Sequence, residues 1–428
     1  MPSGRSALSE PEEGVTPSEA NRWGQLVIGI VCMILIANLQ YAWTLFVGPM
    51  HAVHGWKLAG IQVAFSLFVA LETWFTPLAG WSVDRLGAHL GPRIVAGVGG
   101  VLVALGWIIN SAAGSLPMLY LGAAVSGVGA GSVYATSVGN AAKWFPDRRG
   151  LAIGLTAGGF GAGAALTIIP IRLMIAAHGY GATFFWFGLV QGGIVLLISQ
   201  FLRAPSRQRL VPAGRPAKVQ QSRRSHPPHE VLVSPVFWIL WVMFIMIAAS
   251  GLMVTAQLAP IARTYGVAHV IVLAGGSVLT VALIIDNVLN GLARPFFGWV
   301  SDHIGRPTTM ALAFGVGAVS YWLLGSFGMN PWLFVIFSGL IFFTWGEIFS
   351  LFPAMCTDVF GPEYATANAS LLYTAKGAAA FLVPLANVLT AGTGSWRIVF
   401  LIAALMNAAV VVAALTILRG ATTRALSQ

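Results

Sequence analysis

Two cationic side chains stand inside long apolar runs of this 428-residue sequence: Arg294 in the run 286–295 and Lys376 in the run 371–377. An ionisable group at the centre of a bilayer costs about 2.5–3.5 kcal/mol on insertion scales, so it is expected to face a partner or a water-filled cavity. The planar fork of an arginine suits a carboxylate, and a lysine is a compact point charge that a second carboxylate can meet. The two residues together therefore indicate a site for a small anion.

Both cations are expected at the same depth in the membrane. Each lies about 12 residues from one end of its apolar segment, which at 1.5 Å per helical residue is about 18 Å, near the midplane. Asp286 and Asn290 precede Arg294 at intervals of four residues, so the three form one polar stripe on a helix. A substrate site at the midplane, between two cations of the same half of the chain, follows from this placement.

Three acidic residues within apolar runs leave alternatives open. Asp286 and Glu347 can neutralise Arg294 and Lys376 as structural pairs, although Asp286 lies two turns, about 12 Å, from Arg294 along the helix. Glu347 can pair with Lys376 as a gate or as a static pair. Glu72 can carry a proton, or it can be a protonated side chain bonded to a neighbouring helix.

The composition shows which elements must position these side chains. Hydrophobic residues make up 57% of the chain and charged residues 8%, whereas about 25% is usual in soluble proteins. A water-covered surface cannot be built from so few charges, so a polytopic membrane protein is the class that remains. The only two cysteines, Cys32 and Cys356, exclude a disulfide framework and a Cys-x-x-Cys metal site. We expect no metal and no cofactor.

About twelve apolar segments are long enough, at about 20 residues each, to span a bilayer. The expected fold is all-α, with two pseudo-symmetric six-helix halves. The expected parts are an N-terminal tail (1–21), a first half (22–202), a linker (203–233), a second half (234–419) and a C-terminal tail (420–428). The spans are expected near residues 23–47, 60–83, 93–110, 117–142, 150–175, 182–202, 235–259, 270–299, 308–327, 331–357, 364–390 and 396–418.

A short motif after the second span recurs after the eighth, at a constant offset of 218 residues. Duplicated halves with substrate bound at their interface are typical of secondary transporters. Acid–base pairs at such helix ends can hold one conformation against another. The residues expected to form this latch are Gly80, Asp84, Arg85 and Gly87 in the first copy and Asp302 and Arg306 in the second.

The distribution of lysine and arginine predicts orientation, because cytoplasmic loops retain an excess of both. Of the 23, all but six lie on the side that holds the linker and both termini; Lys57, Arg263 and Arg397 lie opposite, and Arg172, Arg294 and Lys376 lie within spans. We therefore expect a multi-pass protein of the plasma or inner membrane with both termini cytoplasmic. Arg172 is expected to reach the headgroups, or to attract anions at the outer mouth, and His51 and His54 to be solvated in a loop.

The motif Gly-x-x-x-Asp-Arg-x-Gly at 80–87 resembles the loop signature of the major facilitator superfamily. The runs 39–45, 143–152, 290–298 and 342–346 resemble the oxalate/formate antiporter family, which is related to the monocarboxylate transporters. This resemblance implies the major facilitator fold, with Arg294 and Lys376 binding a dicarboxylate. It also implies an enclosing cage of Gln40, Tyr41, Gln62, Tyr134 and Trp345. Phe160 and Phe349 stand where oxalate carriers can have tyrosine, and Asp286 replaces an uncharged residue.

The function expected from these features is secondary transport of a small carboxylate by alternating access, as exchange of anions such as oxalate and formate. Proton-coupled monocarboxylate symport is the first alternative, since Asp286 can take up a proton. A carboxylate sensor that does not transport is another. No nucleophile–base arrangement supports an enzyme, and the positive charge is explained by topology rather than by nucleic acid. The expected partners are the carboxylate, the lipid bilayer and protons, and the chain is expected to be a monomer.

Overall fold

The computed structural model describes residues 19–145, 149–205, 222, 224–361, 364–418 and 420. Within these ranges the chain is helical apart from turns and a single β-bridge between Ile271 and Ser277. Residues 1–18 and 421–428 of the expected tails, residues 206–221 and 223 of the linker, and residues 146–148, which belong to one of the family-like runs, lie outside the described part. The all-helical fold class predicted from the sequence is therefore confirmed.

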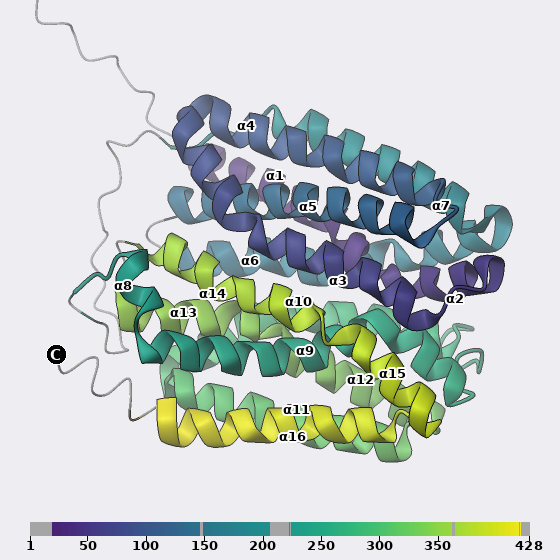
Figure 1. Cartoon of the computed structure of the whole chain (residues 1–428). Helices are drawn as coiled ribbons and strands as arrows, with labels where there is room; N and C mark the ends of the chain where they lie inside the picture. The colour runs from purple at the N-terminus through teal and green to yellow at the C-terminus, as the bar shows by residue number, and fades with distance from the viewer. Residues whose placement is uncertain are drawn as a thin grey trace, which may run out of the picture.

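Two groups of helices lie side by side, the earlier part of the chain above the later part in Figure 1. The first comprises α1 (Glu19–Tyr41), α2 (Trp43–His54), α3 (Leu58–Trp74), α4 (Thr76–Ser111), α5 (Leu116–Trp144), α6 (Arg149–Ala162), the turn η1 (Gly163–Leu166) and α7 (Ile168–Ser199). The second comprises α8 (Pro228–Leu232), α9 (Pro235–Thr264), α10 (Val278–Ile304), α11 (Arg306–Phe327), α12 (Pro331–Gly346), α13 (Ile348–Phe360), α14 (Ala365–Ala380), α15 (Val383–Thr393), α16 (Arg397–Ala413) and the π-helical turn η3 (Ala414–Leu418).

Eleven segments of the described chain are long and apolar enough to cross a membrane, and one of them, 151–199, has 49 residues. A single crossing needs only about 20 residues, so this segment supplies two. Gly179, with φ 80° and ψ 168°, makes the reversal between them, at the place where the sequence predicts a turn. Gly87, with φ 85°, turns the chain in the same way within α4. A side chain would strain both positions, so glycine is required there.

The eighth span begins later than predicted, at Val278 rather than near residue 270. The preceding residues form a turn in which Ala274 and Gly275 both have positive φ. Ser277 then caps the helix by accepting a hydrogen bond from the amide of Thr280. Apolar composition marks this segment as membrane-compatible but does not distinguish such a turn from helix.

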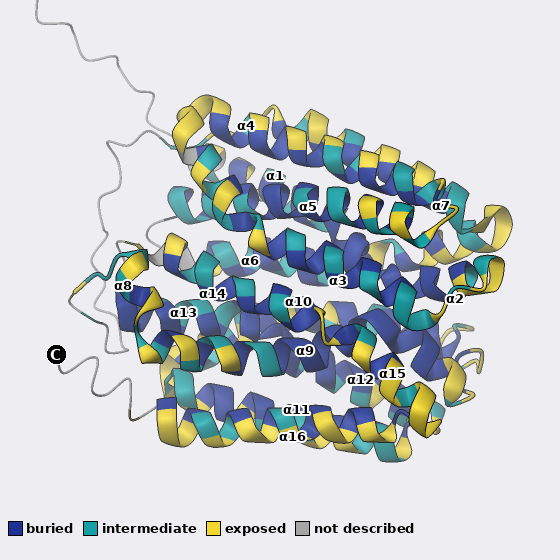
Figure 2. Cartoon of the chain, in the orientation of Figure 1, coloured by how far each residue is buried: buried dark blue, intermediate teal, exposed yellow. Residues whose placement is uncertain are grey.

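The outward faces of the helices are apolar, as contact with lipid requires. Along α4, exposed residues include Ile94, Val98, Val101 and Leu105, spaced three or four residues apart. Figure 2 shows similar exposed stripes on the outer helices α7, α11 and α16. The polar groups that the next section describes are instead buried between the two halves. This inversion of the soluble pattern is what the charge scarcity of the sequence predicts.

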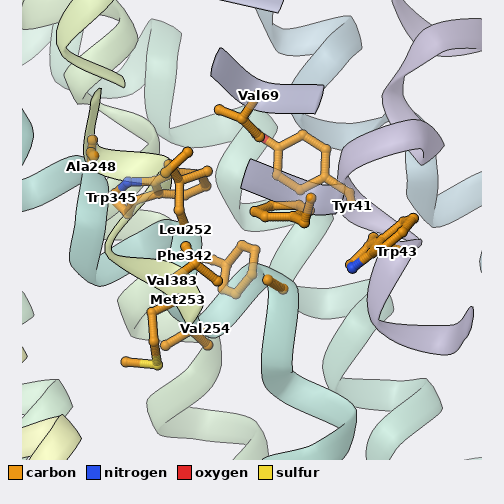
Figure 3. Close-up of a cluster of buried hydrophobic side chains, with 14 of the residues drawn as sticks. Tyr41, Trp43, Val69, Ala248, Leu252, Met253, Val254, Phe342, Trp345 and Val383 are labelled. Carbon is orange, nitrogen blue, oxygen red and sulfur yellow. The ribbon is translucent and has the colours of Figure 1, made fainter. Parts of the chain in front are cut away.

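The largest apolar cluster crosses the boundary between the halves. Figure 3 shows Tyr41, Trp43 and Val69 of the first half against residues of the second, among them Phe342 and Trp345. Ring pairs such as Tyr41 and Trp345, with centroids 6.3 Å apart, span the boundary directly. The main helix crossings between halves pair α3 with α14 and α6 with α10.

Candidate functional site

Arg294 lies on α10, is 1% exposed, and joins the two halves of the protein. One terminal nitrogen donates to the carbonyl oxygen of Ala157 on α6, at 2.7 Å. The other donates to Asn290 Oδ1 at 3.0 Å and to the Tyr41 hydroxyl at 3.3 Å. The guanidinium also stacks 4.3 Å from the ring centre of Phe349. Arg294 forms no ion pair with any described acid. Its Nε is buried and has no hydrogen-bond partner among the described residues. It is therefore a buried cation with donor capacity to spare.

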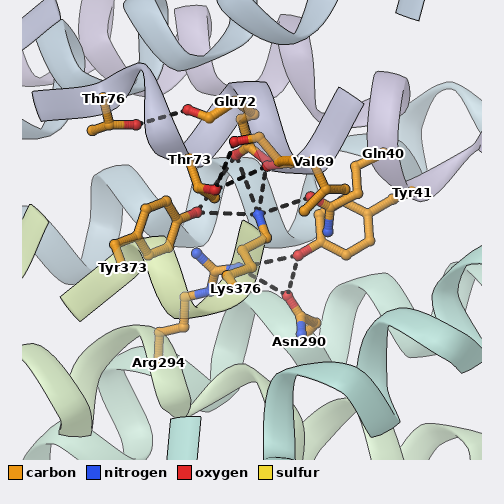
Figure 4. Close-up of polar contacts among 11 residues, drawn as sticks. Gln40, Tyr41, Val69, Glu72, Thr73, Thr76, Asn290, Arg294, Tyr373 and Lys376 are labelled. Atoms are coloured by element: carbon orange, nitrogen blue, oxygen red, sulfur yellow. Dashed lines mark hydrogen bonds and ion pairs between the residues drawn. The ribbon is translucent and has the colours of Figure 1, made fainter. Parts of the chain in front are cut away.

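Lys376 on α14 is equally buried but fully paired (Figure 4). Its Nζ lies 2.9 Å from Glu72 Oε2 and 3.2 Å from Glu72 Oε1, across the boundary between the halves. It also donates to Gln40 Oε1 at 2.9 Å and to the Tyr373 hydroxyl at 3.1 Å. Three acceptor residues thus match the three N–H donors of an ammonium group.

The acidic partner of Lys376 differs from the one suggested by the sequence. The alternative that paired it with Glu347 is wrong: both Glu347 carboxylate oxygens are buried and lack a hydrogen-bond partner among the described residues. The alternative that paired Asp286 with Arg294 is also wrong, since Asp286 Oδ1 instead accepts a hydrogen bond from Ser338 Oγ at 2.9 Å. Helical spacing gives the depth and face of a side chain, but not which residue of the other half faces it.

Aromatic rings lie around the two cations. Phe160 lies 5.5 Å from Tyr41 and 5.6 Å from Tyr134, measured between ring centroids. Phe349 lies 5.6 Å from Trp345, and Lys376 Nζ lies 5.5 Å from the centroids of both Phe160 and Phe349. Rings in these positions limit the contact of a cation with water, which strengthens its electrostatic interactions.

One residue beside Lys376 escaped the sequence reasoning, and one expected cage residue lies apart from both cations. Tyr373 stacks on Tyr134, with centroids 5.4 Å apart, and binds Lys376; its position three residues before Lys376 on the same helix was the available signal. Gln62 instead accepts from Trp43 Nε1 at 3.2 Å and donates to the Ala256 carbonyl at 3.0 Å. It therefore closes the far side of the interface and contacts neither cation.

A cavity of about 490 Å³ leads from the linker side of the protein to Arg294. Its walls come from both halves, with Gly154 and Ala157 on α6 facing Phe349 and Pro353 on the other side. Lys376 is absent from its lining. A small anion that enters from the linker side therefore meets Arg294 first.

The opposite side of the interface is closed by hydrogen bonds between the halves. The amide of Ala259 donates to Thr44 Oγ1 at 2.8 Å. Arg172, an exposed residue of α7, donates to Ser277 Oγ at 3.0 Å and to Thr280 Oγ1 of the second half. His54, expected to be solvated, stacks on Trp56 with centroids 4.0 Å apart. The structure is open toward the linker and closed at the other end.

The repeated motif behaves differently in its two copies. In the second, Arg306 pairs with Asp302 at 2.7 Å and with Asp358 at 3.1 Å, at the mouth of the cavity. In the first, Arg85 lies over the Trp81 ring, 5.1 Å from its centroid, and the side chain of Asp84 lies outside the described part. A Cβ at Gly80 would meet open space. Glycine is therefore not needed at this position to let two helices pack closely. Close approach occurs instead at Gly91, where a Cβ would lie 2.1 Å from the Val83 carbonyl oxygen.

No group of three or more metal-binding side chains occurs among the residues that the structure describes. The polar atoms at the site are two cations, one acid and several neutral donors and acceptors. This set can bind and orient an anion.

Comparisons with known proteins agree with the all-helical membrane fold. The family model described as Major Facilitator Superfamily matches residues 26–289 and 274–427. The chain is 34% identical over 402 residues to the oxalate:formate antiporter of Oxalobacter formigenes, covering 94% of this chain and 92% of that protein. It is 24% identical over 366 residues to the uncharacterized MFS-type transporter YhjX of Escherichia coli, covering 85% and 87%. It is 24% identical over 370 residues to monocarboxylate transporter 12-B of Danio rerio, covering 78% and 75%.

Proposed function

The chain belongs to the Major Facilitator Superfamily, and within it to the family of the oxalate:formate antiporter; from that premise we propose that it exchanges small carboxylates across the membrane by alternating access. It is a multi-pass membrane transporter rather than an enzyme. Oxalate and formate are the first substrates to test, because a relative that is 34% identical over 94% of this chain is named for them.

The observation that carries the proposal is the state of Arg294. It is a buried guanidinium without an acidic partner among the described residues, and it ends a cavity that opens between the two halves. Leaving such a charge uncompensated in an apolar interior is costly, so the site favours an anion that restores neutrality. A carboxylate that accepts from Nε and from a terminal nitrogen would gain two charge-assisted hydrogen bonds.

The same residues connect binding to movement of the halves. Arg294 reaches from α10 to Ala157 and Tyr41 of the first half, so an anion bound there touches both halves. Closing the cavity around it would require the opposite hydrogen bonds, such as Thr44 to Ala259, to break. We assign the open, linker side to the cytoplasm from the excess of basic residues there. On this assignment the structure is the cytoplasm-facing state. The latch expected from the two motif copies remains part of the proposal.

The expected division into two tails, two halves and a linker remains part of this proposal, as do the remaining cage residues. Gln40, Tyr41, Tyr134, Trp345, Phe160 and Phe349 would form the walls around the bound anion. Asp286 and Glu347 take no part in holding it, because neither contacts Arg294 or Lys376 among the described pairs.

A second candidate is proton-coupled symport of a monocarboxylate. The observation that favours it is the ion pair between Glu72 and Lys376, which crosses the boundary between the halves. Proton uptake by Glu72 would weaken this pair and so link protonation to the relative position of the halves. The similarity to monocarboxylate transporter 12-B points the same way.

Purified protein in liposomes separates the two candidates. We would measure uptake of labelled oxalate, formate and lactate with and without an internal counter-anion, and with and without an imposed pH gradient. Exchange predicts uptake that requires internal anion and ignores the gradient, whereas symport predicts uptake that follows the gradient. Uptake of none of the three would refute both candidates, and carboxylate binding without uptake would identify a sensor.

A further inference from the structure

We propose that Glu72 determines the charge of the substrate. By occupying Lys376 it leaves Arg294 as the single free cation among the described residues of the site, and that cation takes a monocarboxylate in preference to a dicarboxylate. The inference rests on the proposed function and deepens it. It gives Glu72, a residue of the first half, a role in substrate specificity. The two cations of the site belong to the second half.

Glu72 stands where the second carboxylate of a dianion would have to bind. Both of its oxygens lie within 3.2 Å of Lys376 Nζ, and Glu72 and Lys376 are completely buried. Gln40 and Tyr373 take the remaining donors of the ammonium group. A substrate carboxylate therefore finds no free N–H on Lys376 unless it displaces one of these three.

The described residues around Glu72 offer its carboxylate no cationic partner other than Lys376. The groups that face its carboxylate are Lys376 and Tyr373, both from α14, with Gln40 beside them from α1. The main chain at Glu72 packs tightly against α5, where a Cβ at Gly131 would collide with the Glu72 carbonyl oxygen. Displacing Glu72 would leave a buried carboxylate unpaired, which is strongly unfavourable. The pair is thus held in place by the packing around it.

The internal repeat gives an independent argument. Under the offset of 218 residues, Glu72 corresponds to Asn290. The two equivalent positions each hold one cation: Asn290 Oδ1 accepts from Arg294 at 3.0 Å, and Glu72 Oε2 accepts from Lys376 at 2.9 Å. A neutral amide orients its cation and leaves the charge free, whereas a carboxylate cancels it. The difference between these two residues gives the group of two cations and Glu72 a net charge of one, which a monoanion neutralises.

The test is the substitution Glu72→Gln, which keeps the size and the acceptor oxygen but removes the charge. Glu72→Asp is the matched control, because it keeps the charge on a shorter side chain. We would measure the dissociation constants of labelled formate and labelled oxalate for each purified protein at neutral pH. The ratio of the oxalate constant to the formate constant should fall by about tenfold or more in Glu72→Gln, since a released Lys376 can then bind the second carboxylate. In Glu72→Asp the ratio should stay near that of the wild type.

A double variant keeps the inference falsifiable if Glu72→Gln alone is unstable. Glu72→Gln with Lys376→Gln removes both members of the pair and leaves Arg294, so formate should still bind while oxalate gains nothing. Loss of formate binding in the double variant would show that Lys376 contacts the substrate directly and would overturn the inference. So would an unchanged ratio in a stable Glu72→Gln protein. If the wild type binds formate or oxalate but the ratio does not move, the inference alone fails; if the wild type binds neither, the proposed function fails and the inference falls with it.

Discussion

The crossing of α6 and α10 offers a sharp test of the geometry, because two glycines of α6 differ only in their surroundings. A Cβ at Gly161 would lie 2.7 Å from Asn290 Oδ1 and 3.0 Å from the Gly291 Cα. A Cβ at Gly154, two turns earlier on the same helix, would meet nothing closer than the Pro295 Cα at 4.0 Å. Gly161→Ala should therefore force the halves apart beside the residue that orients Arg294, whereas Gly154→Ala should fit.

The magnitude follows from two opposing effects. Alanine is favoured over glycine within a helix by about 1 kcal/mol, and this gain is common to both variants. Overpacking a well-packed contact typically costs about 1–3 kcal/mol. Gly154→Ala should thus be neutral or slightly stabilising, and Gly161→Ala should lie about 1–3 kcal/mol below it. The comparison cancels helix propensity and isolates the contact between the halves.

The assay is thermal unfolding of both purified variants in detergent at one scan rate, together with formate exchange in liposomes. We expect Gly161→Ala to unfold at the lower temperature and to exchange more slowly, because a shift of Asn290 also disturbs Arg294. Equal unfolding temperatures and equal exchange rates for the two variants would refute the described crossing. A lower stability of Gly154→Ala than of Gly161→Ala would refute it as well.

Three further predictions concern the open side, the closed side and the buried pair. A cysteine introduced at Thr357, on the cavity wall, should react with a membrane-impermeant thiol reagent added on the linker side, and a bound carboxylate should protect it. A cysteine introduced at Ala256, which is buried, should not react. Arg172→Gln should expose the cysteine at Ala256 to reagent from the opposite side, because it removes hydrogen bonds between the halves; continued protection would contradict the closure assigned to Arg172. Lys376→Gln alone should cost about 3–5 kcal/mol of stability by leaving Glu72 unpaired, and adding Glu72→Gln should recover most of it, as thermal unfolding would show. Equal stability of the single and double variants would mean that the pair is not formed.

Much of the fold was predictable because membrane helices obey few rules. Scarce charge excluded a soluble surface, and the lengths of the apolar runs gave the spans within a few residues in most cases. The repeat of 218 residues gave the two halves. The apolar runs did not reveal the helix breaks inside spans. Examples are the break at Ala42, between α1 and α2, and the break at Glu347, between α12 and α13. Such breaks depend on packing between helices rather than on hydropathy.

The site was predictable in its types but not in its pairings. Charge inside a span singled out Arg294 and Lys376, and spacing placed them at one depth. Glu72 was identified as a buried acid, yet its contact with Lys376 depends on how α3 meets α14 in the other half, which no local pattern encodes. For the same reason Gln62, a cage residue by resemblance, belongs to the closed side of the interface.

The central claim is that Arg294 binds the transported carboxylate, and equilibrium binding of labelled formate to purified Arg294→Gln protein tests it most directly. Hydrogen bonds to a charged group contribute about 1.5–3 kcal/mol, so the dissociation constant should rise by about 10- to 150-fold relative to the wild type. Unfolding temperature, measured on the same preparation, would establish that the variant is folded. A folded Arg294→Gln protein that binds formate as tightly as the wild type would contradict the account.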